Sequence, residues 1–518
     1  MKIKLVSIES GIAAMGFRRI VSVVKNIEPL VQIYFLPTDN LYSLKSHIFP
    51  SQIKSLNNKE IIGISKHLAD TDLIAFSSMT ASSKYVEKIS KHIKQINPKA
   101  YIIWGGIHPT LYPNESLKYV DAICVGEGEL PIETFLKNYL EGKNFYNTPN
   151  FWFKKNKSIK RNPNLQLSDS NLLNKFPLPY NGLDSLIYDI NQHKFRQLNK
   201  YDYTIYNGLL YRTLWTLGCP FNCAYCANDS FIKIDPGYRK LRYPNVDHMI
   251  NEIKGAIKIH PYIRTIAFYD DNFVALPLPV IKEFCQKYKK EIHLPFVVFG
   301  FHPNLVDKEK INLLGKAGMN RTRMGIQSGS PDTLKFFNRP TTINKIIEST
   351  TILADAAVKY KMIAPSYDII SDVPVESSEN IKETLQLVHR LKKPFTLTVF
   401  SLRVFPKTQL FNYVQNNPKF KKYFKNSSYL DTKMTFNNIL LYLLATFKIP
   451  DFIFNKLTDV AINPKNRTKE YPVLFTLTKI LYLTKRGLDH LAHFDFSTIT
   501  GKWTYYVWKI KYQFIDKL

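Results

Sequence analysis

Three cysteines stand within eight positions in the stretch TLGCPFNCAYCAND, with the spacing Cys219-x3-Cys223-x2-Cys226. Thiolates at this spacing can bind zinc or an iron–sulfur cluster. Structural zinc takes four ligands, usually from paired Cys-x2-Cys motifs, so a fourth would have to come from Cys124, Cys285 or a distant histidine. On a cluster of four irons, three cysteines leave one iron open, and an open iron can chelate the amino and carboxylate groups of a small molecule.

The composition describes a large, basic chain. Its 518 residues are 45% apolar, which predicts two or three domains and excludes a disordered protein. Five cysteines are too few for a disulfide framework and suit a reducing compartment. The net charge of +29 admits nucleic acid, an anionic membrane surface or an acidic substrate as a partner, and a general richness in Lys and Asn explains it equally well. Because neither a signal peptide nor a run of roughly 20 apolar residues occurs, we expect a cytoplasmic protein.

Two intervals alternate strand-like and helix-like segments. In residues 1–140, apolar runs such as LIAFSS and AYIIWGG alternate with SSKYVEKISKHIKQI, whose apolar residues have helical spacing. This alternation predicts an α/β fold with a parallel sheet, which binds ligands where loops leave the carboxyl ends of its strands. Residues 206–410 contain six further strand–helix units and predict a partial (β/α)6 barrel with its site at the strand ends.

The other two intervals lack this alternation. Residues 141–205 are rich in Asn, Lys and Pro, which predicts a linker with a hairpin across residues 155–158. Residues 411–518 are apolar, aromatic and basic, with 17 Lys and Arg against 7 Asp and Glu, and are predicted to be mostly helical. These helices could pack on the barrel, close its pocket or lie on a membrane surface. Nucleic acid is disfavoured because no RNA- or DNA-binding motif accompanies the charge.

The cysteine loop, with Tyr225 before its last cysteine and a strand before it, resembles the radical S-adenosylmethionine (radical SAM) superfamily. The resemblance implies that the three cysteines hold a [4Fe-4S] cluster whose open iron binds S-adenosylmethionine. One electron from the cluster then yields a 5′-deoxyadenosyl radical, which abstracts hydrogen from an unactivated carbon. It also implies an electron donor such as flavodoxin or ferredoxin.

Further barrel motifs resemble the same family. By this resemblance, FYDDNF places Asp270 or Asp271 near the S-adenosylmethionine amine, although either carboxylate could instead cap a helix. GIQSGS places Gln327 and Ser328 where relatives have Glu and Ser next to the ribose.

Two other motifs depart from the family pattern. SDVPVES carries Asp372 and Val375, and FPKTQL carries Lys407, where relatives have glycine. Glycine in such loops permits a positive φ or the close approach of a ligand, so the adenine and substrate contacts are open to question.

The first 140 residues resemble the cobalamin-binding, Rossmann-like domain that precedes the barrel in one branch of the superfamily. The Asp-x-His-x-x-Gly signature is missing from IESGIAAMG, so cobalt is not expected to take a histidine from that motif. His108 could replace it as a ligand, but a histidine bonded to the backbone or to the nucleotide tail is favoured. Small or polar residues at strand ends leave room for that tail. The residues that carry this resemblance are Ser77, Met79, Gly105, Gly106, His108, Gly126, Glu127, Gly128 and Glu129.

Together these features predict a B12-dependent radical SAM enzyme that methylates an unactivated carbon of a small-molecule or lipid substrate. Radical cyclisation or rearrangement without methyl transfer is the alternative, and a non-catalytic scaffold is another. The methylthiotransferase branch is disfavoured, because its front domain supplies three further cluster cysteines and this one has only Cys124. Both Cys124 and Cys285 are expected to be inert core residues.

Overall fold

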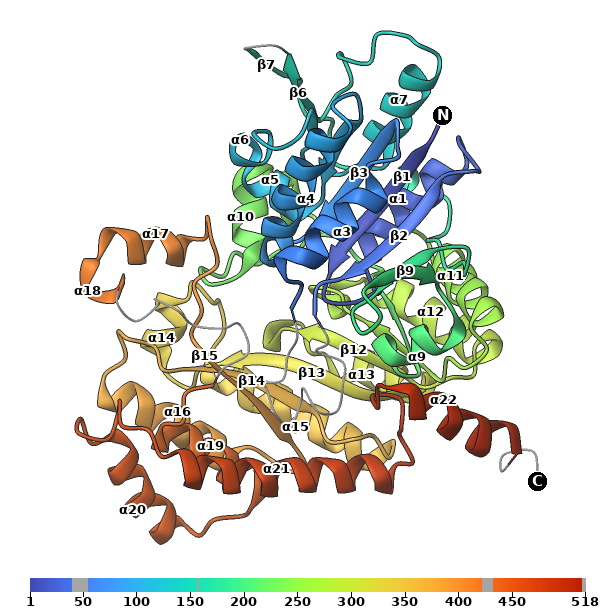
Figure 1. Cartoon of the computed structure of the whole chain (residues 1–518). Coiled ribbons are helices and arrows are strands. Elements are labelled where there is room, and N and C mark those ends of the chain that lie inside the picture. The colour runs from blue at the N-terminus through green and yellow to red at the C-terminus, as the bar shows by residue number, and fades with distance from the viewer. Residues whose placement is uncertain (40–54, 156–157, 422–431, 515–518) are drawn as a thin grey trace. The chain divides into compact units, whose positions relative to one another are not determined.

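The structure is a computed structural model that describes residues 1–39, 55–155, 158–421 and 432–514 (Figure 1). The chain forms two compact units. Unit 1 comprises residues 1–212, 247–264 and 497–518, and unit 2 comprises residues 213–246 and 265–496.

Unit 1 is built on a nine-stranded sheet in the order β7-β6-β5-β4-β3-β1-β2-β8-β9. Its central strands β2, β1, β3, β4 and β5 pair in parallel. The strands are β1 Ile3–Glu9, β2 Gln32–Pro37, β3 Leu73–Ser78, β4 Tyr101–Gly105, β5 Ala122–Cys124, β6 Phe151–Lys155, β7 Ser158–Arg161, β8 Leu186–Asp189 and β9 Lys194–Gln197. The helices are α1 Met15–Lys25, α3 Asn58–Leu68, α4 Ser83–Ile96, α5 Ile107–Leu111, α6 Pro113–Ser116, α7 Glu129–Leu140, α8 Ser170–Leu173, α9 Lys200–Asn207, α11 Val246–Ile259 and α22 Lys502–Trp508.

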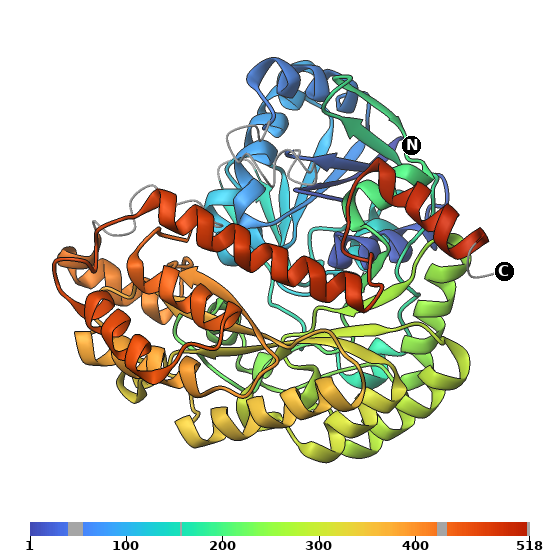
Figure 2. The same cartoon turned by 90° about the horizontal axis from the view of Figure 1, so that it is seen from below.

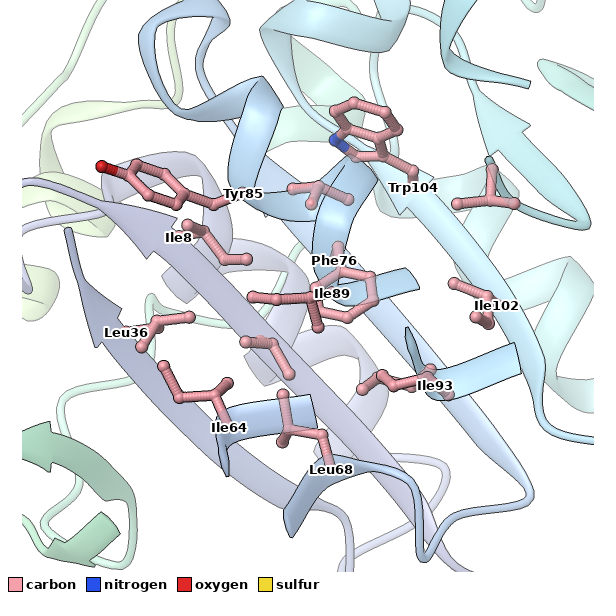
Figure 3. Close-up of a cluster of buried hydrophobic side chains, with 14 of the residues drawn as sticks. Ile8, Leu36, Ile64, Leu68, Phe76, Tyr85, Ile89, Ile93, Ile102 and Trp104 are labelled. Carbon is pink, nitrogen blue, oxygen red and sulfur yellow. The ribbon is translucent and has the colours of Figure 1, made fainter. Parts of the chain in front are cut away.

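Helices cover both faces of this sheet, as its continuously apolar strands require. On one face, α3 and α4 turn Ile64, Leu68, Ile89 and Ile93 onto Phe76 and neighbouring strand residues, all at most 2% exposed (Figure 3). On the other face, α1 and α7 pack their apolar sides on the same strands. The prediction of an α/β fold for the first 140 residues is confirmed.

The interval 141–205 is part of the sheet rather than a linker. The predicted hairpin is present as β6 and β7, which pair Lys155 with Ser158, and a second hairpin, β8 with β9, extends the opposite edge. Phe151 and Phe153 alternate inward from β6 and are fully buried. The sequence signal for these short strands is weak, because the interval is rich in Asn, Lys and Pro and each strand has only four or five residues over which alternation could show.

The order in which the chain adds strands to the parallel sheet reverses at β1. The chain runs from β1 to β2 on one side and from β3 to β5 on the other. Loops at the carboxyl ends of β1 and β3 therefore leave in opposite directions, which creates the crevice where such sheets bind ligands.

A second sheet has six strands in the order β10-β11-β12-β13-β14-β15. From β11 to β15 every neighbouring pair is parallel, and helices alternate with strands, so the predicted partial (β/α)6 barrel is confirmed. The strands are β10 Leu210–Thr213, β11 Thr265–Phe268, β12 Phe296–Phe301, β13 Met319–Gln327, β14 Ser366–Ser371 and β15 Thr396–Ser401. The associated helices are α10 Ala227–Ile234, α12 Leu278–Glu291, α13 Lys308–Ala317, α14 Pro331–Phe336, α15 Ile343–Lys359 and α16 Ser378–Arg390.

Helices follow the last barrel strand, as predicted. Within unit 2 they are α17 Gln409–Asn416, α18 Pro418–Lys421, α19 Phe436–Thr446, α20 Asp451–Ile462 and α21 Pro472–Ala492. The long helix α21 lies beside α19 (Figure 2). Among the described residues, no helix combines the length and apolar character needed to cross a membrane.

Candidate functional site

The cysteine loop connects β10 to α10 and is held by backbone hydrogen bonds. The amide of Cys219 donates to Tyr238 O at 3.0 Å, and Gly218 precedes it with φ 95°. A Cβ on Gly218 would lie 2.4 Å from Lys240 O and 2.7 Å from Tyr238 O, so only glycine fits this turn. The loop is therefore fixed before its first cysteine.

The second half of the loop is tied to two distant segments of the same unit. The amide of Ala224 donates to Phe337 O at 2.8 Å, and its carbonyl accepts from Leu410 N at 2.9 Å. Asp229, in the first turn of α10, accepts hydrogen bonds from the backbone and side-chain nitrogens of Gln409 at 2.6 and 2.7 Å. These links hold the three cysteines in one rigid loop.

The three thiols lie near one another in a poorly solvated environment. Burial, with a smaller contribution from the Asp271 carboxylate, raises the pKa of Cys219 to about 11 and that of Cys226 to about 12. Cysteine binds a metal as thiolate, so these groups need cations nearby. In the described part of the chain, no three His, Cys, Asp or Glu side chains form a group that could hold a single metal ion. In an iron–sulfur cluster each cysteine binds a different iron. The three thiolates of this loop can therefore bind a cluster although they do not meet at a single metal ion.

Arg339 supplies a buried cation next to the cysteines. Its guanidinium lies 3.6 Å from Cys223 Sγ, donates to Tyr225 Oη at 3.0 Å and also donates to Gly325 O. The sequence analysis missed this residue, because it follows α14 in an ordinary turn and belongs to none of the recognised motifs. Its charge suits thiolates or a carboxylate bound at the loop.

The two aspartates after β11 have different roles. Asp270 is 2% exposed and accepts from Trp215 N, Thr216 N and Thr216 Oγ1 at 3.3, 2.5 and 2.6 Å. It therefore fixes the strand end before the cysteine loop, and does not cap a helix. Burial raises its pKa to about 6. Asp271 is exposed to solvent. The protein packed around its carboxylate nevertheless limits the hydration of the charged form and so raises the pKa of Asp271. Of the two, Asp271 is the carboxylate available to an ammonium group.

Of the other predicted barrel residues, two contact the protein itself and one is a candidate for contact with a ligand. Tyr225 packs edge-on against Phe337 at 5.0 Å and accepts from Arg339, so it supports the loop. Gln327 ends β13 with φ 75° and is 9% exposed. Ser328 is fully buried, with its hydroxyl 3.0 Å from Thr384 Oγ1. Gln327 remains the candidate for a ribose hydroxyl, whereas Ser328 connects β13 to α16.

Asp372 shows what replaces a glycine after β14. It has φ 55°, in the left-handed region, and its carboxylate accepts from Ser401 and from Asn438 Nδ2, the latter at 2.8 Å. Ser371 and Thr435 add hydroxyl donors at 3.3 Å. The carboxylate therefore joins the ends of β14 and β15 to α19. Lys407, the other replacement, also has a positive φ, of 66°.

In unit 1, the predicted cofactor residues of β3 and β4 gather at neighbouring strand ends. Ser77 lies at the end of β3, Met79 follows it with 48% of its surface exposed, and Gly105 ends β4. Gly106 has φ 99°, and a Cβ there would lie 2.9 Å from Ser78 O. Small residues thus keep this edge of the sheet open, as the tail of a nucleotide requires.

His108 is held by aromatic stacking. Its ring lies 5.0 Å from Trp104 and 5.2 Å from Tyr112, both at 26°. Only 7% of the residue is exposed, burial lowers its pKa, and its Nδ1 has no hydrogen-bond partner among the described residues. A neutral imidazole with a nitrogen of this kind could accept a hydrogen bond from a ligand or donate one to it.

The GEGE loop connects β5 to α7. Gly126 has φ 84° and donates to Thr110 Oγ1 at 3.0 Å, and Gly128 precedes α7. Glu127 accepts from Ser168 N at 2.7 Å, so its carboxylate anchors the downstream chain. Burial raises the pKa of Glu129, the first residue of α7. The loop is a shaped strand end in which Glu127 already has a structural role.

Glu9 is a carboxylate at the end of β1, where the order of the parallel strands reverses. The sequence analysis did not single out this residue. It ends β1, and burial raises its pKa to about 7 while Arg18 opposes the shift. Acidic residues at strand ends are common in soluble proteins, so its type alone carried no signal.

Comparison with known proteins agrees with both units. The model of the radical SAM superfamily matches residues 213–388, and that of the B12 binding domain matches residues 51–136. The chain therefore contains a radical SAM domain and a B12-binding domain. The family implies a [4Fe-4S] cluster, S-adenosylmethionine and cobalamin as cofactors, and the cysteine loop and the open strand ends fit them.

Individual relatives are distant. An uncharacterized methyltransferase of Pyrococcus horikoshii is 23% identical over 67% of this chain and 70% of its own length. An anaerobic magnesium-protoporphyrin IX monomethyl ester cyclase of Rubrivivax gelatinosus is 22% identical over 61% of this chain and 54% of its own. The fold matches that of the radical S-adenosylmethionine methyltransferase TsrM of Kitasatospora setae, whose structure has cobalamin and a [4Fe-4S] cluster bound. That match has a TM-score of 0.60 at 13% identity and covers 80% of this chain and 78% of TsrM.

Proposed function

We propose that this protein methylates an unactivated carbon of its substrate by B12-dependent radical SAM chemistry. The observation that carries the proposal is the rigid loop that presents Cys219, Cys223 and Cys226 beside the buried guanidinium of Arg339. When bound, the cluster supplies the electron that cleaves S-adenosylmethionine, and cobalamin supplies the methyl group. An external donor such as flavodoxin or ferredoxin would deliver that electron.

The side chains around the loop would bind and orient the cofactors. Arg339 would neutralise thiolate or carboxylate charge, and Asp271 would pair with an ammonium group. Gln327 would hydrogen-bond a ribose hydroxyl without adding charge. In unit 1, the strand ends at Ser77 and Gly106 would accept the nucleotide tail of cobalamin.

The names of the relatives support two reactions. The Pyrococcus protein and TsrM are named methyltransferases, which favours methyl transfer. The Rubrivivax protein is named a cyclase, so radical cyclisation without methyl transfer is the second candidate. Substrate identity is not transferred by the fold, because one fold supports many substrates.

The cluster is tested by anaerobic reconstitution with iron and sulfide. We expect iron and inorganic sulfide to bind to the full-length protein, and reductant with S-adenosylmethionine to release 5′-deoxyadenosine. Cys226→Ala should lose both properties. Cys285→Ala is the matched control, because Cys285 is buried in α12 and should leave both intact. A cluster-replete protein that releases no 5′-deoxyadenosine would indicate a non-catalytic scaffold.

The reaction type is tested with S-adenosylmethionine that carries a labelled methyl group. Incubation of the reduced protein with an extract of its source cells should yield a labelled product, detected by mass spectrometry. An unlabelled product formed together with 5′-deoxyadenosine would establish cyclisation or rearrangement instead. Cys226→Ala, incubated in parallel, identifies the products that depend on the cluster.

A further inference from the structure

Helix α21 is firmly attached to unit 2 by one of its faces. Phe475, Thr478 and Tyr482 are 3–4% exposed, and Tyr482 Oη accepts from Leu397 N in β15 at 3.1 Å. Lys485 Nζ donates to Ala445 O and Thr446 O at the end of α19, at 2.9 and 2.8 Å. The orientation of the helix on its own unit is therefore fixed.

The opposite face of α21 is apolar and exposed. With 3.6 residues per turn, the side chains that lie along it form one stripe over a helix of 21 residues, which is about 31 Å long. Their exposed fractions lie between 51% and 75%. Six of them define this apolar stripe: Val473, Leu477, Ile480, Leu481, Leu488 and Leu491. A helix that packs only on its protein turns polar residues outward, so this stripe indicates a surface that something covers.

The apolar stripe ends beside a hollow at the carboxyl end of α21. The hollow has a volume of about 580 Å³ and is lined by Val358 and Lys361 from the end of α15 and by His493 and Phe494 after α21. Val358 and Phe494 are each 70% exposed. Apolar surface thus continues past the helix end, next to the cation of Lys361.

Basic residues lie on the same helix. Lys485 Nζ donates to the end of α19, Lys479 Nζ lies 5.4 Å from the centre of the Phe475 ring, and Arg486 Cζ lies 5.8 Å from that of the Tyr482 ring. From residue 472 to residue 488 the sequence has no acidic residue. The next one, Asp489, accepts a hydrogen bond from Ala364 N at 3.0 Å. An exposed apolar face on a helix that carries cations and no acidic residue over this stretch suits a surface that is apolar within and anionic at its boundary.

We propose that the apolar stripe of α21 docks the protein on an anionic phospholipid membrane, with the helix lying in the plane of the interface. The net charge of +29 attracts such a surface and opposes contact with a second copy of the chain. The described helices do not cross a membrane, so docking would be peripheral. This proposal does not rest on the catalytic function.

Vesicle flotation of the full-length protein tests the proposal. Vesicles contain phosphatidylcholine alone, or equal amounts of phosphatidylcholine and phosphatidylglycerol. We expect binding to the anionic vesicles, and both neutral lipid and about 0.5 M salt should weaken it, because salt screens the charge. The double variant Leu477→Asp/Leu488→Asp should bind at least about tenfold more weakly. Leu30→Asp is the control, since Leu30 is 87% exposed but belongs to unit 1.

Three results would overturn the proposal. They are binding to neither kind of vesicle, equal binding by the double variant and the wild-type protein, and a wild-type dimer in light scattering that the double variant abolishes. The last result would show that a second copy covers the apolar stripe. Both substituted side chains are exposed, and circular dichroism confirms that the variant folds. If it did not fold, Ile480→Glu would test the same face, and unchanged binding by that variant would contradict the proposal.

Discussion

In the cysteine loop a glycine occupies the left-handed backbone position, whereas in the loops at the ends of the later barrel strands residues with side chains occupy it. Gly218 has φ 95°, and Gln327, Asp372 and Lys407 have φ 75°, 55° and 66°. A non-glycine residue in this region costs about 1–2 kcal/mol. The backbone conformation is therefore kept in both regions, but in the later loops side-chain contacts must offset the strain.

The two regions differ in how much freedom their surroundings leave. Backbone oxygens crowd Gly218, so no side chain can be accommodated there. Asp372, by contrast, has room for a carboxylate and uses it to accept several hydrogen bonds. A missing glycine in a motif is therefore compatible with an intact loop, as long as the new side chain finds partners.

The largest effect is expected from Gly218→Ala. The added methyl group would meet two backbone oxygens and force the loop to shift, so we expect a loss of about 3 kcal/mol or more in the free energy of unfolding. Iron bound per chain after reconstitution should fall with it. Gly255→Ala is the control, since nothing lies within 4 Å of its Cβ in α11 and a small gain is expected. If Gly218→Ala bound as much iron as the wild-type protein, the cysteine loop would tolerate a side chain as the later loops do, and the difference between the two regions would be contradicted.

Asp372→Gly tests the second region. Glycine relieves the backbone strain but removes the carboxylate that accepts from Ser401 and Asn438, so we expect a net loss of about 2–3 kcal/mol, measured by denaturant unfolding. Asp372→Asn, which tolerates the same backbone and keeps one oxygen, should lose about half as much. A more stable glycine variant would show that the carboxylate contributes little.

Glu376, four residues further along, predicts a dependence on pH. Burial raises its pKa from 4.5 to about 7, so the folded state holds a proton that the unfolded state releases. Its contribution to stability is complete below pH 4.5 and is lost as the pH rises to about 7. Glu376→Gln should therefore gain about 3 kcal/mol relative to wild type between pH 4.5 and pH 8. A constant difference between the two unfolding curves would contradict this.

The smallest effect is expected from Lys407→Gly. Relief of the positive φ should outweigh the greater freedom of glycine in the unfolded chain, and stability should rise by up to about 1 kcal/mol. The melting temperature should increase slightly, opposite in sign to Asp372→Gly. A clear decrease would mean that Lys407, like Asp372, stabilises its loop through its side chain.

The sequence predicted the parts of the fold with strong periodicity or rigid spacing. Six strand–helix units, the parallel sheet of the first 140 residues and the terminal helices all follow from apolar patterns of adequate length. Between residues 141 and 205 only the hairpin of β6 and β7 was predicted. Strands β8 and β9 and the pairing of both hairpins with the sheet were missed, because strands of four or five residues pair with a sheet that the local sequence does not reveal.

The prediction of the site residues was limited by a different cause. Motifs identified Asp270 and Ser328 as cofactor residues, but the structure gives both of them hydrogen bonds to the protein. Arg339 was missed, because its proximity to Cys223 arises from the fold and not from sequence spacing. A side chain's type predicts what it could bind, whereas its partners in the protein decide whether it is available.

The hairpins that extend the sheet of unit 1 limit where the chain can be divided. A fragment ending at residue 140 would expose the hydrogen-bonding groups of β5 and β2 and would lack Phe151 and Phe153 from its core. Unpaired parallel strands of this kind invite aggregation. Isolation of a soluble B12-binding fragment therefore calls for retaining the chain through β9 at least, well past the last residue that the family pattern covers.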